Sequence, residues 1–289
     1  MTQPITRRDF LRVIKNILFS MIALGSGSTA YSFWWEPHWL EIVDIDLALP
    51  RLPAAFSGFR ILQLSDIHIG GWMNRERLKH IVDVIQSQKA DLIVMTGDYV
   101  LGHAWTEHLE QVADDFILEI SRLTQDHEVL AVLGNHDHWT DALRVRDMLT
   151  HSGVIELNNK VYSLRRDVAE LHIAGVDDIW EQKDRLDDVH RILPETGAAI
   201  LLAHEPDFAD KSARNGRFDL QLSGHSHGGQ VVIPFWGPPI LPYLGQKYPS
   251  GLYKVRDMWQ YTNRGVGMIE PSVRFNCRPE ITIFTLHAP

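Results

Sequence analysis

Short apolar, β-prone runs alternate with amphipathic segments along much of the chain. Each of five such runs leads directly into polar side chains; they cover residues 60–64, 92–95, 129–133, 199–202 and 220–222. Between them apolar residues recur at helical spacing, as in Leu78, Ile81, Val82 and Ile85. We predict helices over residues 74–88, 106–124, 140–152 and 183–193. This alternation favours stacked layers of sheet and helix.

Other strands are predicted outside these five runs. Residues 41–47 alternate between apolar and polar, which predicts a half-buried strand closed off by Pro50 and Pro53. After Val154 strands dominate, and we place them at 161–164, 171–174, 230–233, 252–255 and 281–286. The Pro- and Gly-rich segment 234–245 is too apolar for a flexible tether and predicts an ordered loop beside the functional site. With no repeat or linker, residues 36–289 form one domain after a leader of residues 1–35.

Composition and charge narrow the classes of function. The chain has 289 residues, 45% of them hydrophobic, which is enough for a substantial core. Its net charge is −9, but residues 1–35 carry +3, so the remainder carries −12 and is a poor candidate for nucleic-acid binding. Cys277 is the only cysteine, so neither an intramolecular disulfide nor a thiolate-rich metal site is possible.

The N-terminal segment resembles a bacterial twin-arginine export signal. Arg7 and Arg8 stand before Phe10-Leu11, and a moderately apolar stretch and a Gly/Ser-rich segment follow. This resemblance implies the twin-arginine export machinery as a partner and a location on the periplasmic or extracytoplasmic face of the bacterial inner membrane. The alternatives are a basic tail on a cytosolic enzyme and a domain held on the cytoplasmic face.

The fate of the leader is a separate question. Residues 16–35 carry no charge and have about the length of a bilayer span, and Phe33, Trp34, Trp35 and Trp39 follow as an interfacial aromatic belt would. Ser28-Thr29-Ala30 is a passable cleavage region, and the aromatic residues also suit core packing of a first strand. We favour retention at the inner membrane.

The polar side chains after the five apolar runs are of the kinds that bind hard or borderline metals. Carboxyl ends of strands are where open α/β sheets place their ligand sites. Asp66 and His68 are two residues apart, as are His225 and His227, so in an extended segment both members of a pair face the same way. Glycine precedes Asp98, Asn135 and His225 and permits close backbone approach. A His, Asp and Asn ligand set suits manganese, iron, zinc or cobalt.

In order and spacing these segments resemble the calcineurin-like metallophosphoesterase superfamily. The matching elements are Asp66-x-His68, Gly97-Asp98, Gly134-Asn135-His136-Asp137, His204 and Gly224-His225-x-His227. The resemblance implies an α/β (α+β) fold, a four-layer αββα sandwich of two mixed sheets flanked by helices. It also implies two divalent cations at the strand ends. One would be held by Asp66, His68, Asp98 and His227, and the other by Asp98, Asn135, His204 and His225.

The same resemblance implies how such a centre works. Asp98 would bridge, with each of its two oxygens meeting one cation, and a shared hydroxide would attack phosphorus in line. His136 would not coordinate but would donate a hydrogen bond or proton to the phosphoryl or leaving oxygen. Asp137 either orients that imidazole or is solvated at the surface. His103, His108 and His151 are interpreted as ordinary polar residues, and His138 is the best further candidate for substrate contact.

Further similarity extends over residues 38–287 to a bacterial branch of YaeI-type phosphodiesterases and, more distantly, to UDP-2,3-diacylglucosamine hydrolases of lipid A biosynthesis. It lies in segments 228–230, 251–253, 261–267 and 274–280. Within them, Arg264 and Arg274 either contact a second phosphate or head group or pair with Glu280. We expect a phosphodiesterase acting on a phosphodiester or phospholipid-like substrate. The alternatives are a lipid A pathway pyrophosphohydrolase and a non-catalytic binding module.

Overall fold

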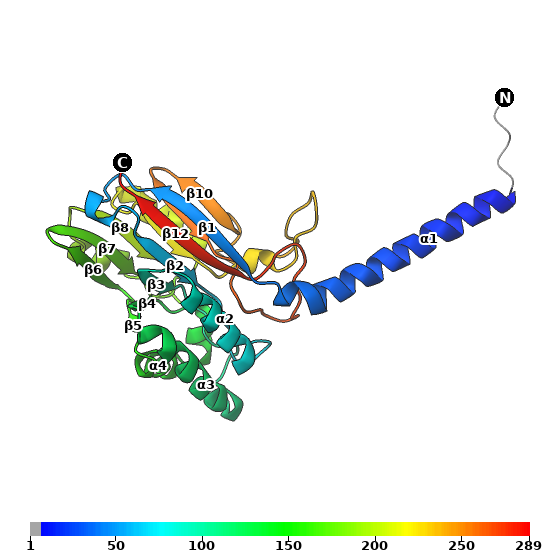
Figure 1. The fold of residues 1–289 in the computed structure, drawn as a ribbon, viewed down its shortest axis with the longest axis horizontal. Coiled ribbons are helices and arrows are strands. Elements are labelled where there is room, and N and C mark those ends of the chain that lie inside the picture. The colour runs from blue at the N-terminus through cyan, green and yellow to red at the C-terminus, as the bar shows by residue number, and fades with distance from the viewer. Residues whose placement is uncertain (1–6) are drawn as a thin grey trace.

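The computed structural model describes residues 7–289 and arranges their strands in two six-stranded mixed sheets (Figure 1). The first sheet has, in spatial order, β1 (Glu41–Ala48), β12 (Glu280–His287), β2 (Arg60–Leu64), β3 (Leu92–Met95), β4 (Val129–Ala131) and β5 (Ile155–Glu156). The second has β10 (Gly251–Val255), β11 (Met258–Thr262), β9 (Leu220–Ser223), β8 (Ala198–Leu202), β7 (Ala169–Gly175) and β6 (Lys160–Arg166). Within each sheet, the strands that precede the predicted ligands pair in parallel, so their carboxyl ends share one edge.

Helices cover the outer face of each sheet. The α-helices are α1 (Arg7–Ala30), α2 (Arg75–Ser87), α3 (Glu107–Thr124), α4 (Asn135–His151), α5 (Leu186–Ile192) and α6 (Ala209–Ser212). A π-helical turn, η1 (Tyr31–Trp35), follows α1, and the 3-10 turns are η2 (Glu36–His38), η3 (Ala54–Phe56), η4 (Pro206–Phe208), η5 (Ala213–Asn215) and η6 (His227–Gly229). The sandwich therefore has the four layers that the sequence predicts.

Three apolar clusters hold these layers together. Residues of α2, α3 and α4 pack on one face of the first sheet, against side chains such as Leu62 and Ile93. The opposite face of that sheet packs on the second sheet, where Ile61 and Leu92 share a cluster with Ile200. The outer face of the second sheet, including Leu201, packs on α5 and α6. Successive strand residues thus enter different clusters because their side chains alternate between faces.

Local sequence signals position α2 and α3. Asn74 caps α2 by accepting the N–H of Arg77 at 3.0 Å, and Thr106 caps α3 by accepting the N–H of Leu109 at 3.2 Å. Each cap contributes about 1 kcal/mol. Their apolar stripes, which the spacing in the sequence predicts, are buried.

Some predicted elements differ in the structure. Residues 230–233 form no strand. Val231 and Ile233 make isolated β-bridges instead, to Phe275 and Gly237. The helix predicted at 140–152 begins earlier, at Asn135, because a first helical turn joins it across a kink at Asp141 (φ −177°, ψ 96°). The helix predicted at 183–193 is shorter in the structure, where it is α5. The structure also contains β5 and β11, which the sequence does not predict. The half-buried strand at 41–47 is confirmed as β1.

The N-terminal segment is joined to the domain through Glu36. Helix α1 projects away from the two sheets (Figure 1). After it the chain enters the domain at Glu36, whose fully buried carboxylate accepts the N–H of Asn276 at 2.8 Å and that of Cys277. Residues 1–6 of the predicted leader lie outside the described residues.

None of the helices in residues 7–289 combines the length and apolar character that a membrane crossing requires.

Candidate metal centre

The predicted ligands lie at the adjoining carboxyl ends of strands from both sheets. Asp66 and His68 follow β2, Asp98 follows β3, and Asn135 opens α4 after β4. The three remaining histidines follow β8 and β9 of the second sheet. All seven side chains are buried, between 0% and 5% exposed. Residues up to 161 positions apart along the chain therefore meet in one place, as predicted.

The backbone geometry behind this convergence differs from the prediction. Asp66 and His68 are not in extended conformation; their φ angles are +52° and +51°. Asp98, His225 and His227 also have positive φ, at +57°, +71° and +50°. Left-handed backbone at a residue other than glycine costs about 1–3 kcal/mol. Such strain at five predicted ligands is typical of a site whose side chains must be aimed at one point.

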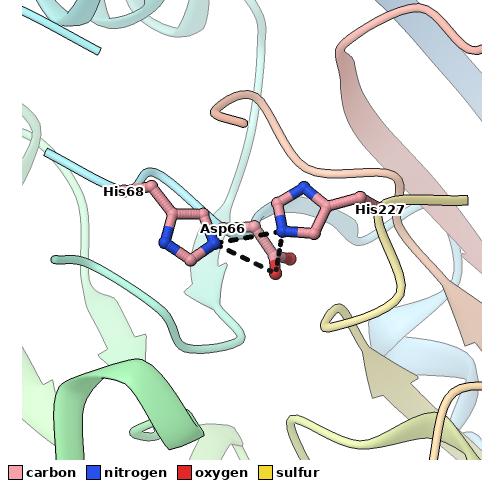
Figure 2. Close-up of side chains that lie close together, drawn as sticks. All are labelled: Asp66, His68 and His227. Carbon is pink, nitrogen blue, oxygen red and sulfur yellow. Dashed lines mark hydrogen bonds and ion pairs between the residues drawn. The ribbon is translucent and has the colours of Figure 1, made fainter. Parts of the chain in front are cut away.

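Asp66, His68 and His227 form the first group (Figure 2). The Nε2 atoms of the two imidazoles are 3.0 Å apart, and Asp66 Oδ1 lies 3.4 Å from His227 Nε2 and 4.0 Å from His68 Nε2. In Figure 2 these three donor atoms point at one another. Two imidazole nitrogens and a carboxylate oxygen in a buried triangle are a donor set for a divalent cation.

Asp98, His204 and His225 form the second group. His204 Nδ1 donates to the Thr96 carbonyl at 2.6 Å, and His225 Nε2 donates to the Tyr243 carbonyl at 2.8 Å. These bonds fix both tautomers and leave His204 Nε2 and His225 Nδ1 buried without a hydrogen-bond partner. Asn135 Oδ1 is unpartnered in the same way. Buried polar atoms without a partner are rare in folded proteins, and a cation satisfies all three once any proton on His204 Nε2 has left.

Asp98 lies between the two groups. Its Oδ2 atom is 3.6 Å from His68 Nε2 and 3.2 Å from His204 Nε2. Its Oδ1 atom instead accepts the N–H of His136 at 2.9 Å. One carboxylate oxygen therefore faces both groups and the other accepts a backbone N–H, whereas the expectation was that each oxygen would face a different cation.

A comparison with known protein families agrees with this geometry. The family model described as calcineurin-like phosphoesterase matches residues 59–229. The chain belongs to this family. It is 34% identical to the uncharacterized metallophosphoesterase YkuE of Bacillus subtilis (strain 168), over 98% of both chains. It is 31% identical to the phosphodiesterase YaeI of Escherichia coli (strain K12), over 98% of this chain and 99% of that one. An uncharacterized metallophosphoesterase of Helicobacter pylori (strain ATCC 700392 / 26695) is 27% identical over 98% of this chain and 75% of its own.

Burial sets the protonation of this phosphoesterase's metal-binding groups. It lowers the pKa of His68 to about 3, lowers that of His225, and lowers that of His227 still further below its usual range. Burial also raises the pKa of Asp66 to about 7. The imidazoles are thus neutral, as metal coordination requires, and the desolvated carboxylate gains most from a nearby cation. The two groups fit two divalent cations.

Asp98 and His204 behave as a pair. Burial disfavours both charged forms, but the attraction between the two side chains outweighs it, so the pKa of Asp98 falls well below its usual range and that of His204 rises well above. A proton on His204 Nε2 would take the place of a cation beside Asp98. Metal binding must displace that proton.

His136 lies beside the first group without belonging to it. Its ring packs edge-on against His68 and Trp139, with centroids 4.9 Å apart in each case. Its Nδ1 atom is buried and has no hydrogen-bond partner. Burial lowers the pKa of this imidazole, which keeps it neutral near pH 7. This placement agrees with the prediction that His136 does not coordinate a cation.

Asp137 has neither of the two roles predicted for it. It is fully buried, and its carboxylate accepts four backbone N–H groups, at distances from 2.8 to 3.3 Å. The donors are Asp98, Tyr99, Val100 and Gly134. Asp137 thus joins the two loops that carry Asp98 and Asn135.

The two arginines have different roles. Arg264 pairs with Glu280, as one interpretation predicts, and donates to Glu41 at 2.7 Å. Arg274 is fully buried and pairs with no carboxylate among the described residues; it donates to the carbonyls of Arg264, Gly265, Gly267 and Cys277. Gly267 in turn donates to the Asp66 carbonyl at 2.7 Å. Arg274 therefore supports the backbone beneath Asp66 rather than a phosphate.

The sequence did not predict the aromatic wall around the centre. Trp139 packs on His136 and stacks on His103, and Trp180 packs on His225 and Tyr243. Trp139 lies three residues after His136 on α4, a spacing that places both on one helix face. Trp180 and Tyr243 lie on loops with no such signal. His138 bonds to Asp177 at 2.7 Å and its side chain is only 9% exposed, so it is a structural residue rather than the expected substrate contact.

Proposed function

We propose that this protein is a dinuclear-metal phosphodiesterase. The observation that carries the proposal is the set of three buried, unpartnered ligand atoms beside an Asp98 oxygen that faces both groups. The relative YaeI is named a phosphodiesterase, which supports a phosphodiester rather than a phosphomonoester as the substrate. A non-catalytic binding module has less support, because such a module does not need His136 or a complete ligand set.

The side chains divide the work of the reaction. When bound, two divalent cations supply an activated water and neutralise charge on the phosphoryl oxygens. Asn135 offers a neutral oxygen, which limits the negative charge that a phosphate anion must approach. His136 is neutral near pH 7 and has a ring nitrogen free, so it can hold a hydrogen bond at the leaving oxygen. The wall of Trp139 and Trp180 excludes water from one side.

Hydrolysis assays test this proposal directly. The full chain, stripped with a chelator and reloaded with Mn²⁺, Fe²⁺, Zn²⁺ or Co²⁺, should hydrolyse bis(p-nitrophenyl) phosphate faster than p-nitrophenyl phosphate. His136→Ala should lower kcat by roughly 10²–10³-fold, the usual cost of removing one hydrogen-bond donor that stabilises the transition state. His151→Ala is the matched control, since that histidine ends the same helix and bonds only to the Asp147 carbonyl. Metal-loaded wild type that hydrolyses neither ester would refute the proposal.

For the natural substrate we propose a membrane-derived or lipid-linked phosphodiester. Support comes from Arg7 and Arg8 at the start of the projecting helix α1, which favour twin-arginine export and retention at the extracytoplasmic face of the inner membrane. Assay of UDP-2,3-diacylglucosamine beside glycerophosphodiesters separates this substrate from the lipid A alternative at the cytoplasmic face. Fusing residues 1–40 to a reporter, with and without Arg7→Lys/Arg8→Lys, tests export and retention; a reporter that stays cytosolic in both forms contradicts them.

A further inference from the structure

An uncharged loop projects from the rim of the metal centre. Residues 231–245, here called the apolar loop, contain no charged side chain and four prolines. Phe235, Trp236 and Ile240 are 111%, 84% and 79% exposed. Large apolar side chains gathered in water are unfavourable, and contiguous patches of them mark interaction sites.

Part of the backbone of the apolar loop is suited to an apolar medium. Ile233 and Gly237 exchange two N–H to carbonyl hydrogen bonds of 3.0 and 2.8 Å, and Trp236 donates to the same Ile233 carbonyl. Pro234, Pro238 and Pro239 have no N–H to satisfy. At these positions the backbone loses little when water is removed, because a paired or absent N–H avoids the several kcal/mol that a free N–H costs in hydrocarbon.

The base of the loop belongs to the catalytic rim. The Tyr243 carbonyl accepts the hydrogen bond from His225 Nε2, and the Tyr243 ring packs against Trp180. Gly229, two residues after His227, lies close enough to Pro238 and Ile240 that a side chain there would clash. A surface or molecule that contacts Phe235, Trp236 and Ile240 therefore lies close to the metal centre.

A second exposed aromatic group continues this surface. Phe33, Trp34, Trp35 and Trp39 are exposed, and Tyr31 packs edge-on against Phe275, the residue that bridges Val231. A groove of about 240 Å³ between the two segments is lined by Ser28, Thr29, Ser32, Phe33, Val231, Val273 and Phe275. In Figure 1 the apolar loop, yellow to gold, projects on the side from which α1 leaves the domain. That helix carries Arg7, Arg8, Arg12 and Lys15 in its first half.

We propose that the apolar loop and the aromatic segment 33–39 dock on the surface of a phospholipid bilayer. Tryptophan, tyrosine and phenylalanine at a water boundary match the chemistry of the lipid interface, and the basic first half of α1 matches its anionic head groups. The remaining domain is strongly acidic and would be repelled by those head groups, which leaves this uncharged surface to make contact. If the proposed function holds, docking places lipid phosphodiesters at the metal centre.

Vesicle flotation of the full chain tests the docking surface. The probe is vesicles of phosphatidylethanolamine and phosphatidylglycerol, and the variant is Phe235→Ser/Trp236→Ser/Ile240→Ser. We expect its partition to fall at least about tenfold, because three exposed apolar side chains contribute well over the 1.4 kcal/mol that a tenfold change represents. Val168→Ser is the matched control; that residue is 101% exposed at the β6–β7 turn.

The outcomes separate docking from catalysis. The triple variant should hydrolyse bis(p-nitrophenyl) phosphate at the wild-type rate, since none of the three side chains is a ligand. Vesicle binding that depends on the loop, with no hydrolysis by wild type, would support docking and defeat the proposed function. Wild type that does not float, a triple variant that floats equally, or binding abolished by salt alone would overturn the docking proposal; the first of these results would point to a protein partner instead.

Discussion

Replacing Asp137 by Asn tests whether one buried carboxylate fixes the loops of the metal centre. Each carboxylate oxygen accepts two N–H groups: Oδ2 those of Asp98 and Gly134, and Oδ1 those of Tyr99 and Val100. An amide keeps only one acceptor oxygen, so two bonds are lost and an NH₂ group faces N–H donors. Hydrogen bonds to a charged group contribute about 1.5–3 kcal/mol each, so the gross loss is about 3–6 kcal/mol; relief of the buried charge, whose cost shows in the raised pKa of Asp137, offsets part of it.

The measurement is thermal unfolding of the metal-free full chain at pH 8. Burial raises the pKa of Asp137 to about 7, so the carboxylate is ionised at this pH. A net loss near 2 kcal/mol lowers Tm by roughly 4–8 °C in a domain of this size. Asp141→Asn is the control, because its Oδ1 accepts the N–H groups of Leu143 and Arg144 at an exposed position and an amide oxygen does the same. A Tm for Asp137→Asn within about 2–4 °C of wild type, or 1 kcal/mol, refutes the reasoning.

Three further predictions concern the ligands, the glycines and pH. Asp98→Ala should remove both cations, as measured by metal analysis, whereas Asp66→Ala should retain the second; equal losses would contradict a bridging role for Asp98. Gly224→Ala places a Cβ 2.2 Å from Asp66 Oδ2 and should lower metal occupancy, while Gly27→Ala, with nothing within 4 Å, should not; equal occupancy would argue against this close approach. His172 bonds to Ser163 and Thr196, and burial lowers its pKa, so the unfolded chain takes the proton first. Its contribution to stability is complete above the unfolded pKa of about 6.5 and is lost as pH falls through that value toward the folded pKa. His172→Gln should therefore show a shallower fall in Tm between about pH 7.5 and 5.5; parallel curves would show that the imidazole does not titrate between these states.

The convergence of the seven candidate ligands could be predicted because each follows an apolar run that forms a strand, and parallel strands end at one edge. The position of Trp139 beside His136 could also have been predicted, because the two residues are three apart on a helix. The left-handed backbone at Asp66 and His68 could not be predicted from the sequence. It is imposed by tertiary contacts such as the hydrogen bonds from the N–H groups of Asp66 and His68 to the carbonyls of Gly97 and Asp98.

The role of Asp137 also could not be predicted, because the N–H groups of Tyr99 and Asp98 that it accepts lie 38 and 39 positions earlier in the chain. Arg274 illustrates the same limit. A buried guanidinium that serves four carbonyls has no signature in the sequence, where an arginine beside a phosphoesterase motif suggests phosphate contact.

Each ligand group draws on both sheets. Asp66 and His68 come from the first sheet and His227 from the second, and Asp98 faces His204 and His225 across the same boundary. The sheets share no strand, so bound cations would cross-link two halves that also meet through apolar packing, hydrogen bonds and ion pairs such as that of Arg264 with Glu280. Any substitution in that packing that slides one half against the other distorts both coordination spheres together. Metal affinity therefore reports on the alignment of the whole sandwich as well as on the seven ligands.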